Sequence, residues 1–124
     1  MEFKKVEIKD WELLLSLEKV SATKLFAPLD GEDGYKKYIK ESVVYFIMDG
    51  DEAIGTISYK IQDDGKYYID GLTIKPEFRK QGIAKRAMKK LLDEISDKDL
   101  VLLVHPENNA ALLIYLHLGF AITK

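Results

Sequence analysis

The segment RKQGIA, residues 79–84, combines cations with a glycine where a strand-like run gives way to a helical pattern. Free amides at the start of a helix, together with the helix dipole, attract anions. Gly82 has no side chain to obstruct a phosphate, and Arg79, Lys80 and Lys85 add positive charge. The segment therefore indicates a phosphate-binding helix start, although a turn glycine followed by a solvated basic helix would give the same pattern.

A second pattern lies near the C-terminus, in NNAALLIYLHLGF. Asn108, Ala111, Tyr115 and Gly119 recur every three or four residues, so in a helix they share one face. A carboxamide and a phenol two turns apart on an otherwise apolar helix can reach one ligand together. Taken singly, Asn108 is as readily a helix cap, and Tyr115 a core tyrosine with its hydroxyl at the rim.

These residues need a scaffold, and the periodicity of the chain predicts its first half. The pattern favours a strand over residues 3–10, a helix over 11–20 that Asp10 can cap, a turn-rich break over 27–34 and a short helix over 35–42. The second helix places three residues on one face: Tyr35, Tyr38 and Ile39.

The second half begins with a change of period. Residues 42–76 read as three consecutive strands joined by DGDE and QDDGK, where Gly50 and Gly65 supply the positive backbone angles of tight turns. Residues 82–95 form an amphipathic helix, and we expect its later cations, Lys89 and Lys90, to be solvated. LVLLV then reads as a central strand buried on both faces, NNAALLIYLHLGF as a last helix, and AITK as the start of a last strand.

The resulting order is β-α-α-β-β-β-α-β-α-β. A meander followed by a β-α-β unit implies an α/β (α+β) fold, with a mixed, mostly antiparallel central sheet flanked by helices. The chain has 124 residues, the size of a single domain, and we expect one domain over residues 1–124.

Composition narrows the classes of function. The chain is 47% hydrophobic and 32% charged, as in a soluble globular protein, and it lacks a membrane-length apolar run and a secretory signal, so we expect a cytoplasmic protein. With no cysteine and two histidines far apart, a thiolate nucleophile and a metal site are not expected. The net charge is −2, yet residues 75–90 carry seven cations and one anion. One basic zone on an acidic protein indicates one anionic ligand rather than a nucleic-acid surface.

The two motifs together resemble the GCN5-related N-acetyltransferase (GNAT) family. LTIKPEFRKQGIAKRAMKKLL looks like its acetyl-CoA-binding signature, Arg/Gln-x-x-Gly-x-Gly/Ala. NNAALLIYLHLGF is similar to its later segment, Asn-x-x-Ala-x-x-x-Tyr-x-x-x-Gly-Phe. One helix and one strand separate the two matches, as in the family, and the order of elements agrees. The resemblance therefore covers nearly the whole chain and implies a GNAT-like fold, shortened at the C-terminus.

The resemblance implies an acetyl-CoA-dependent N-acetyltransferase in which the amine of a small molecule or peptide attacks the thioester directly. Acetyl-CoA would lie between the strands YYIDGLTI and LVLLV, Asn108 would contact its pantetheine arm, and Tyr115 would protonate the departing thiolate. A backbone amide near Leu72 would polarise the carbonyl. The residues implied to bind the cofactor are Leu72, Thr73, Ile74, Arg79, Lys80, Gln81, Gly82, Ile83, Ala84, Lys85, Asn108, Ala111 and Tyr115.

The general base and the acceptor pocket follow from the resemblance in outline. Asp70 has the strand alternation of Leu72 and Ile74, and in many relatives an acidic residue or a water chain in this region deprotonates the amine. Alternatively, Asp70 faces solvent or caps a bulge beside Gly71. In this family the first two helices and their connection shape the acceptor pocket, and acidic residues in the connection here would suit a cationic amine. That connection contains Phe26, Asp30, Glu32, Asp33 and Tyr35.

The chain departs from the family at GFAITK, where relatives usually continue through two strands. The acceptor site would then be more open, or a second subunit would complete it, so a homodimer is one expectation. A competing class is a non-catalytic acyl-CoA-binding or regulatory module, against which the retention of Asn108 and Tyr115 argues. The expected partners are acetyl-CoA and an amine acceptor, with no nucleic acid, membrane or metal.

Overall fold

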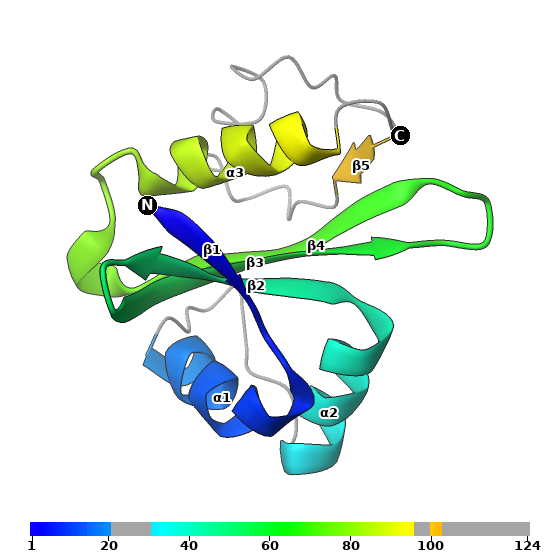
Figure 1. Cartoon of the computed structure of the whole chain (residues 1–124), viewed down its shortest axis with the longest axis horizontal. Coiled ribbons are helices and arrows are strands. Elements are labelled where there is room, and N and C mark those ends of the chain that lie inside the picture. Colours follow the sequence, from blue (N-terminus) through cyan, green and yellow to red (C-terminus); the bar gives the residue numbers. More distant parts are fainter. Residues whose placement is uncertain (21–30, 96–99, 103–124) are drawn as a thin grey trace.

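The computed structural model describes residues 1–20, 31–95 and 100–102. They form a five-stranded sheet in the order β1-β2-β3-β4-β5, with helices on both faces (Figure 1). The elements are β1 (Glu2–Lys5), η1 (Ile8–Asp10), α1 (Trp11–Val20), α2 (Gly31–Glu41), β2 (Val43–Asp49), β3 (Glu52–Ile61), β4 (Tyr67–Ile74), η2 (Pro76–Phe78), α3 (Ile83–Glu94) and β5 (Leu100–Leu102). Strands β1 to β4 pair antiparallel and β5 pairs parallel to β4. The predicted mixed, mostly antiparallel sheet is confirmed.

The two tight turns of the β2-β3-β4 meander form where the sequence predicts them. Gly50 has φ +61° and Gly65 has φ +80°, a region of backbone space that other residues rarely adopt. In the second turn, the Lys66 N–H donates a hydrogen bond of 2.9 Å to the Asp64 carboxylate. These turns keep β2, β3 and β4 adjacent, which brings β4 to the position beside β5.

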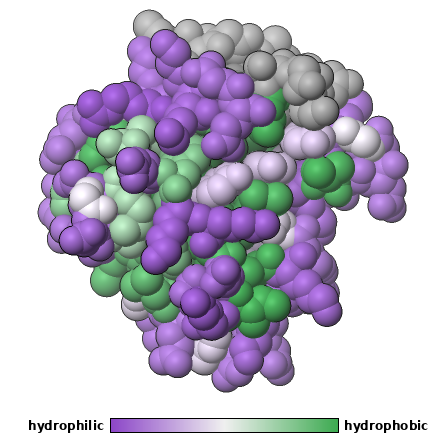
Figure 2. All heavy atoms as spheres, in the orientation of Figure 1, coloured by the Kyte–Doolittle hydropathy of each residue, from purple (hydrophilic) through white to green (hydrophobic). Residues whose placement is uncertain are grey.

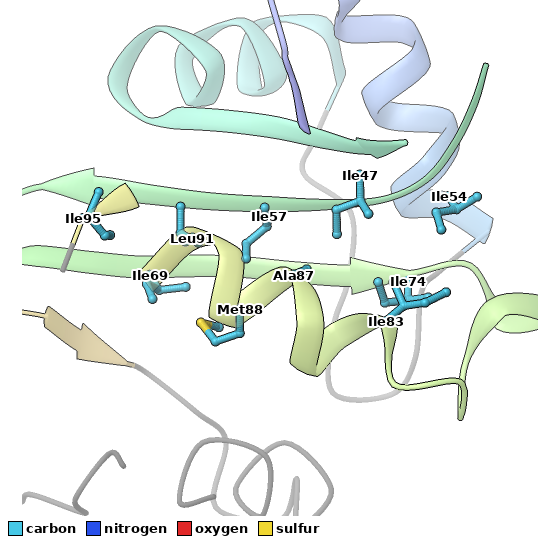
Figure 3. Packing of buried hydrophobic residues seen from close by; sticks show 10 residues of the cluster. All are labelled: Ile47, Ile54, Ile57, Ile69, Ile74, Ile83, Ala87, Met88, Leu91 and Ile95. Carbon is cyan, nitrogen blue, oxygen red and sulfur yellow. The ribbon is translucent and has the colours of Figure 1, made fainter. Parts of the chain in front are cut away.

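One face of the sheet is covered by α3, whose apolar stripe packs on β2, β3 and β4 as predicted (Figure 3). Met88 and Leu91 are fully buried there against Ile57. Burying one such side chain contributes about 1.5–3 kcal/mol. Lys89 is exposed, as expected, but Lys90 is not merely solvated, because its Nζ lies 5.4 Å from the centre of the Phe3 ring.

Helices α1 and α2 cover the opposite face (Figure 1). Leu14 of α1 and Tyr35 of α2 are fully buried, and they share a core with Val44 and Phe46 of β2. Ile39 of α2 also lies in this core, so the predicted apolar face of the second helix is confirmed. The two cores hold the sheet between α3 and the α1–α2 pair, and the short helix η2 with the loop after it connects β4 to α3.

The first predicted strand is shorter than expected. It ends at Lys5, because residues 8–10 turn into the 3-10 helix η1. Asp10 does not cap α1 with its side chain. Its carboxylate accepts a 2.9 Å hydrogen bond from the Glu7 N–H and so closes the preceding turn.

The second helix begins earlier than expected, at Gly31, so the predicted break over 27–34 is wrong from residue 31 onward. Two acidic residues stand in its first turn, where negative charge is favourable. Glu32 also pairs with Lys36 one turn later, at 2.5 Å. These local interactions offset the weak helix propensity of the two glycines in GEDG.

The predicted strand LVLLV is described over Leu100–Leu102 as β5. The predicted last helix and the strand that AITK would start lie outside the described residues. In the ranges that the structure covers, none of the helices has the length and hydropathy needed to cross a bilayer.

Candidate functional site

Gly82 stands at the start of α3 with a left-handed backbone, φ +76° and ψ 10°. A Cβ placed on it would meet no atom within 4 Å, so the space beside its backbone is open. The glycine is required here by its backbone angle, and the open space leaves the helix start accessible to a ligand.

The packing of α3 on the sheet fixes the direction in which its first backbone amides point. The Arg86 N–H donates to the Gly82 carbonyl at 3.1 Å. The amides of Ile83, Ala84 and Lys85 precede that bond, in the turn where a helix leaves donors unpaired along its axis. The Ile83 side chain is 6% exposed and sits in the α3-face core. The helix start is thus anchored to the sheet, and its donors are held in place for an anion.

The loop between β4 and α3 is tied back to the end of the strand. The Arg79 Nε donates to the Ile74 carbonyl at 3.0 Å, and the Gln81 Nε2 donates to the Glu77 carbonyl at 3.3 Å. Lys80 has φ +65°, a strained conformation for a lysine. Strain of this kind collects at ligand sites, and here it adjoins the open glycine.

The predicted cofactor-binding residues of this loop therefore come together at one end of β4. Arg79, Lys80 and Lys85 are exposed there, beside the start of α3. The face of the molecule seen in Figure 2 carries hydrophilic residues over the α3 side, with apolar residues showing in smaller areas. Cations, free amides and an open glycine in one place can bind a phosphate or pyrophosphate.

Strand β4 carries a bulge in its middle. Ser58 of β3 pairs with Gly71, while the next residue, Tyr59, pairs with Ile69, so Asp70 has no partner on β3. A bulge breaks the alternation of side chains along a strand. The predicted alternative of a bulge beside Gly71 describes the backbone at this position. Bulges are frequent next to active sites, where they aim backbone groups away from the ladder.

The three strand residues expected to pair with the cofactor lie just after this bulge. Leu72 and Ile74 pack on the α3-face core, and Ile74 is 7% exposed. The Thr73 hydroxyl is buried and lies 2.7 Å from the hydroxyl of Thr56. The side chains on both faces of this segment therefore pack inside the protein, and its backbone is the part available to a ligand.

The expected acceptor region is partly core. The fully buried Tyr35 donates its hydroxyl hydrogen bond to the Glu18 carboxylate, itself 4% exposed. Glu32 is engaged with Lys36, as above. The Tyr35–Glu18 bond joins α2 to α1, whereas Glu32 and Asp33 are exposed in the first turn of α2. Phe26 and Asp30 lie outside the described residues.

Three further predicted site residues also lie outside the described residues: Asn108, Ala111 and Tyr115. Sequence reasoning missed a pair that the structure brings beneath the bulge, in which the Tyr38 and Ser58 hydroxyls are hydrogen-bonded. Tyr38 had the spacing of a core residue, and a serine inside a strand has no distinctive sequence signal. Their pairing depends on how α2 lies against β3, which periodicity does not specify.

A separate groove of about 390 Å³ lies between α1 and the sheet. Leu13, Leu17 and Val20 line it from α1, and Phe46 and Met48 line it from β2. Of the predicted site residues that the structure describes, none lines this groove. Within residues 1–20, 31–95 and 100–102, no three or more potential metal ligands are grouped together.

Comparison with known proteins agrees with this arrangement. Residues 11–120 match the acetyltransferase (GNAT) family. The chain is 31% identical over 101 residues to the N-terminal acetyltransferase B complex catalytic subunit NAA20 of Arabidopsis thaliana. That alignment covers 73% of this chain and 58% of the relative, so the chain spans little more than half of the length of that protein.

Two solved structures have the same fold at low sequence identity. The ribosomal-protein-S18-alanine N-acetyltransferase of Escherichia coli superposes with a TM-score of 0.81 at 17% identity, over 99% of this chain and 79% of that one. A predicted acetyltransferase of Clostridium acetobutylicum, determined with acetyl-CoA, gives 0.72 at 18% identity, over 99% and 91%. The fold, the motif at the start of α3 and the family match over most of the chain lead to one conclusion: this protein belongs to the acetyltransferase (GNAT) family.

Proposed function

We propose that this protein transfers the acetyl group of acetyl-CoA to a primary amine, which attacks the thioester directly. The observation that carries the proposal is the open, left-handed Gly82 at the start of α3, inside the motif that the family uses for this cofactor. The exposed cations Arg79, Lys80 and Lys85 stand on the same turn and suit a pyrophosphate.

The chain supplies the rest of the machinery from β4 and from its C-terminal motif. The backbone of residues 72–74 would pair with the pantetheine arm, and the amide of Leu72, directly after the bulge, would donate to the thioester oxygen. Asn108 and Ala111 would face the cofactor. Tyr115 would give its proton to the departing thiolate sulfur, which leaves as CoA thiol. Asp70, in the bulge, is the proposed acceptor of the proton lost by the amine.

For the acceptor we propose the α-amino group of a peptide or protein N-terminus. The support is the 31% identity to a relative whose name is an N-terminal acetyltransferase. Placing the amine against the bound thioester would provide much of the rate acceleration, so no covalent enzyme intermediate is needed.

The test is CoA release from acetyl-CoA with a panel of peptides that differ in their first two residues, beside small-molecule amines. We expect release with at least one peptide. Tyr115→Phe should lower kcat by about two orders of magnitude, since general acids contribute about 10²–10⁴-fold. Tyr45→Phe, on β2, is the matched control and should keep the wild-type rate. Acetyl-CoA binding without release for any amine would instead support the non-catalytic acyl-CoA-binding module.

A further inference from the structure

The backbone of the β4 bulge rests on two hydroxyl groups. A Cβ placed on Gly71 would lie 2.9 Å from the Ser58 Oγ and 3.1 Å from the Tyr38 hydroxyl. Both contacts are closer than nearly all real Cβ contacts. The hydroxyl pair therefore occupies the volume that a side chain at residue 71 would fill, and it touches the strand on the face covered by α2.

This pair is built into the interior. Ser58 is completely buried, and its hydroxyl is hydrogen-bonded to that of Tyr38, which reaches the sheet from α2. Burying hydroxyl groups is unfavourable unless they are paired, and an alanine–phenylalanine pair would avoid that cost. A second hydroxyl pair joins Thr56 of β3 to Thr73 of β4, two residues along β3 from Ser58. These two threonines are also buried, but they face each other in the regular register of β3 and β4.

Only the first pair coincides with the register shift. Ser58 is the last residue of β3 in the regular register, and the unpaired Asp70 follows directly from its partner Gly71. One extra residue of β4 interrupts the ladder here, so the position of the neighbouring amides depends on what packs against this part of the strand. In this fold the support is Tyr38 and Ser58, not a side chain of β4.

We propose that Tyr38 and Ser58 are positioning residues for acetyl transfer: their hydroxyl pair fills the side-chain space of Gly71 and holds the bulge so that the Leu72 amide points at the thioester oxygen. This inference rests on the proposed function. The two residues act through the backbone of residues 70–72 and need no contact with either substrate. Since a shift of about 1 Å can lower a rate about 100-fold, a small loss of support is enough to be measured.

The test compares Tyr38→Phe and Ser58→Ala with Thr56→Val, which removes a buried hydroxyl from the neighbouring pair. We expect the first two variants to lower kcat about tenfold or more while the KM for acetyl-CoA changes little. Thr56→Val should keep kcat near the wild-type value even where its loss of stability is as large. Equal kcat losses in all three variants, or unchanged kcat in Tyr38→Phe and Ser58→Ala, would overturn the proposal.

A readout without turnover separates this inference from the proposed function. In ¹⁵N–¹H spectra, Tyr38→Phe should shift the amides of Gly71 and Leu72 and speed their hydrogen exchange more than Thr56→Val does. Undisturbed amides overturn the positioning role whether or not the enzyme is active. If the amides move but the wild-type protein acetylates no amine, the proposed function fails, and with it the role of this pair in catalysis.

Discussion

At the scale of single residues, the proposed cofactor site depends most on Gly82. Its φ of +76° explains why a glycine is needed, and the open space beside it explains how a phosphate could approach the amides of α3. The sequence left two roles open for this glycine, a turn or a phosphate site, and its positive φ is compatible with both. The strained backbone of Lys80, two residues earlier, could not be predicted, because lysine has no tendency toward positive φ.

Replacing Gly82 with a charged residue should separate electrostatics from backbone strain. Asn and Asp have the same shape and both tolerate the left-handed region, so Gly82→Asn and Gly82→Asp carry the same strain. We expect Asp to weaken acetyl-CoA binding about tenfold or more relative to Asn, by repulsion of the pyrophosphate. Isothermal titration calorimetry at two salt concentrations measures this, and the difference should shrink at high salt.

A control for that pair is Gly65→Asp, at a hairpin turn with a similar φ of +80° and equally open space. This variant should bind acetyl-CoA like the wild-type protein, because the turn is at the other end of β4. Equal affinity of Gly82→Asp and Gly82→Asn would show that no phosphate lies at this helix start.

At the scale of elements, periodicity predicted the α3 helix and the meander, whereas a bulge beside Gly71 was only one of the alternatives for this part of β4. The apolar stripe of α3 and the two turn glycines are patterns within short segments of the sequence, and the structure confirms both. The bulge at Asp70 depends on how β4 pairs with β3, which the local sequence pattern does not specify. One extra residue in a strand does not change the amino-acid composition in a recognisable way. The same holds for the start of α2, where charge outweighed two glycines.

The packing of α3 should be the main stabilising contact of the site. Leu91 is fully buried between helix and sheet, so Leu91→Ala should lower the free energy of unfolding by about 2–5 kcal/mol through lost burial and a cavity. Lys89→Ala, exposed on the same helix, should change it by no more than about 0.5 kcal/mol. Urea denaturation followed by circular dichroism measures both. Equal effects would mean that α3 does not pack on the sheet as described.

At the scale of the whole molecule, two stacked aromatic pairs lie on the sheet, one between β1 and β2 and one between β3 and β4. Phe3 stacks on Tyr45 with ring centres 5.3 Å apart, and Tyr59 stacks on Tyr67 at 5.4 Å. Burial raises the pKa of Tyr45 above its usual 10.0, and the charges of Glu94 and Tyr59 raise it further. Burial likewise raises the pKa of Tyr59.

These pKa shifts predict a loss of stability in alkali. Above about pH 10 the unfolded chain releases the tyrosine protons first, so the folded state binds more protons and the free energy of unfolding falls as pH rises. Below pH 10 both states keep the proton and the effect vanishes. Tyr45→Phe removes one such group, so the free energy of unfolding of this variant should fall less steeply with rising pH than that of the wild-type protein. Urea midpoints measured from about pH 9 to 11 test this, and parallel curves would contradict it.

Acetyl transfer to an amine is the central claim, and mass spectrometry of the acceptor tests it most directly. The protein is incubated with acetyl-CoA and the peptide panel, and the peptides are then fragmented to locate any added group. We predict one acetyl group on the α-amino nitrogen of at least one peptide, formed in step with CoA and lost with Tyr115→Phe. Peptides and small amines left unmodified, while acetyl-CoA binds at the start of α3, would contradict the account.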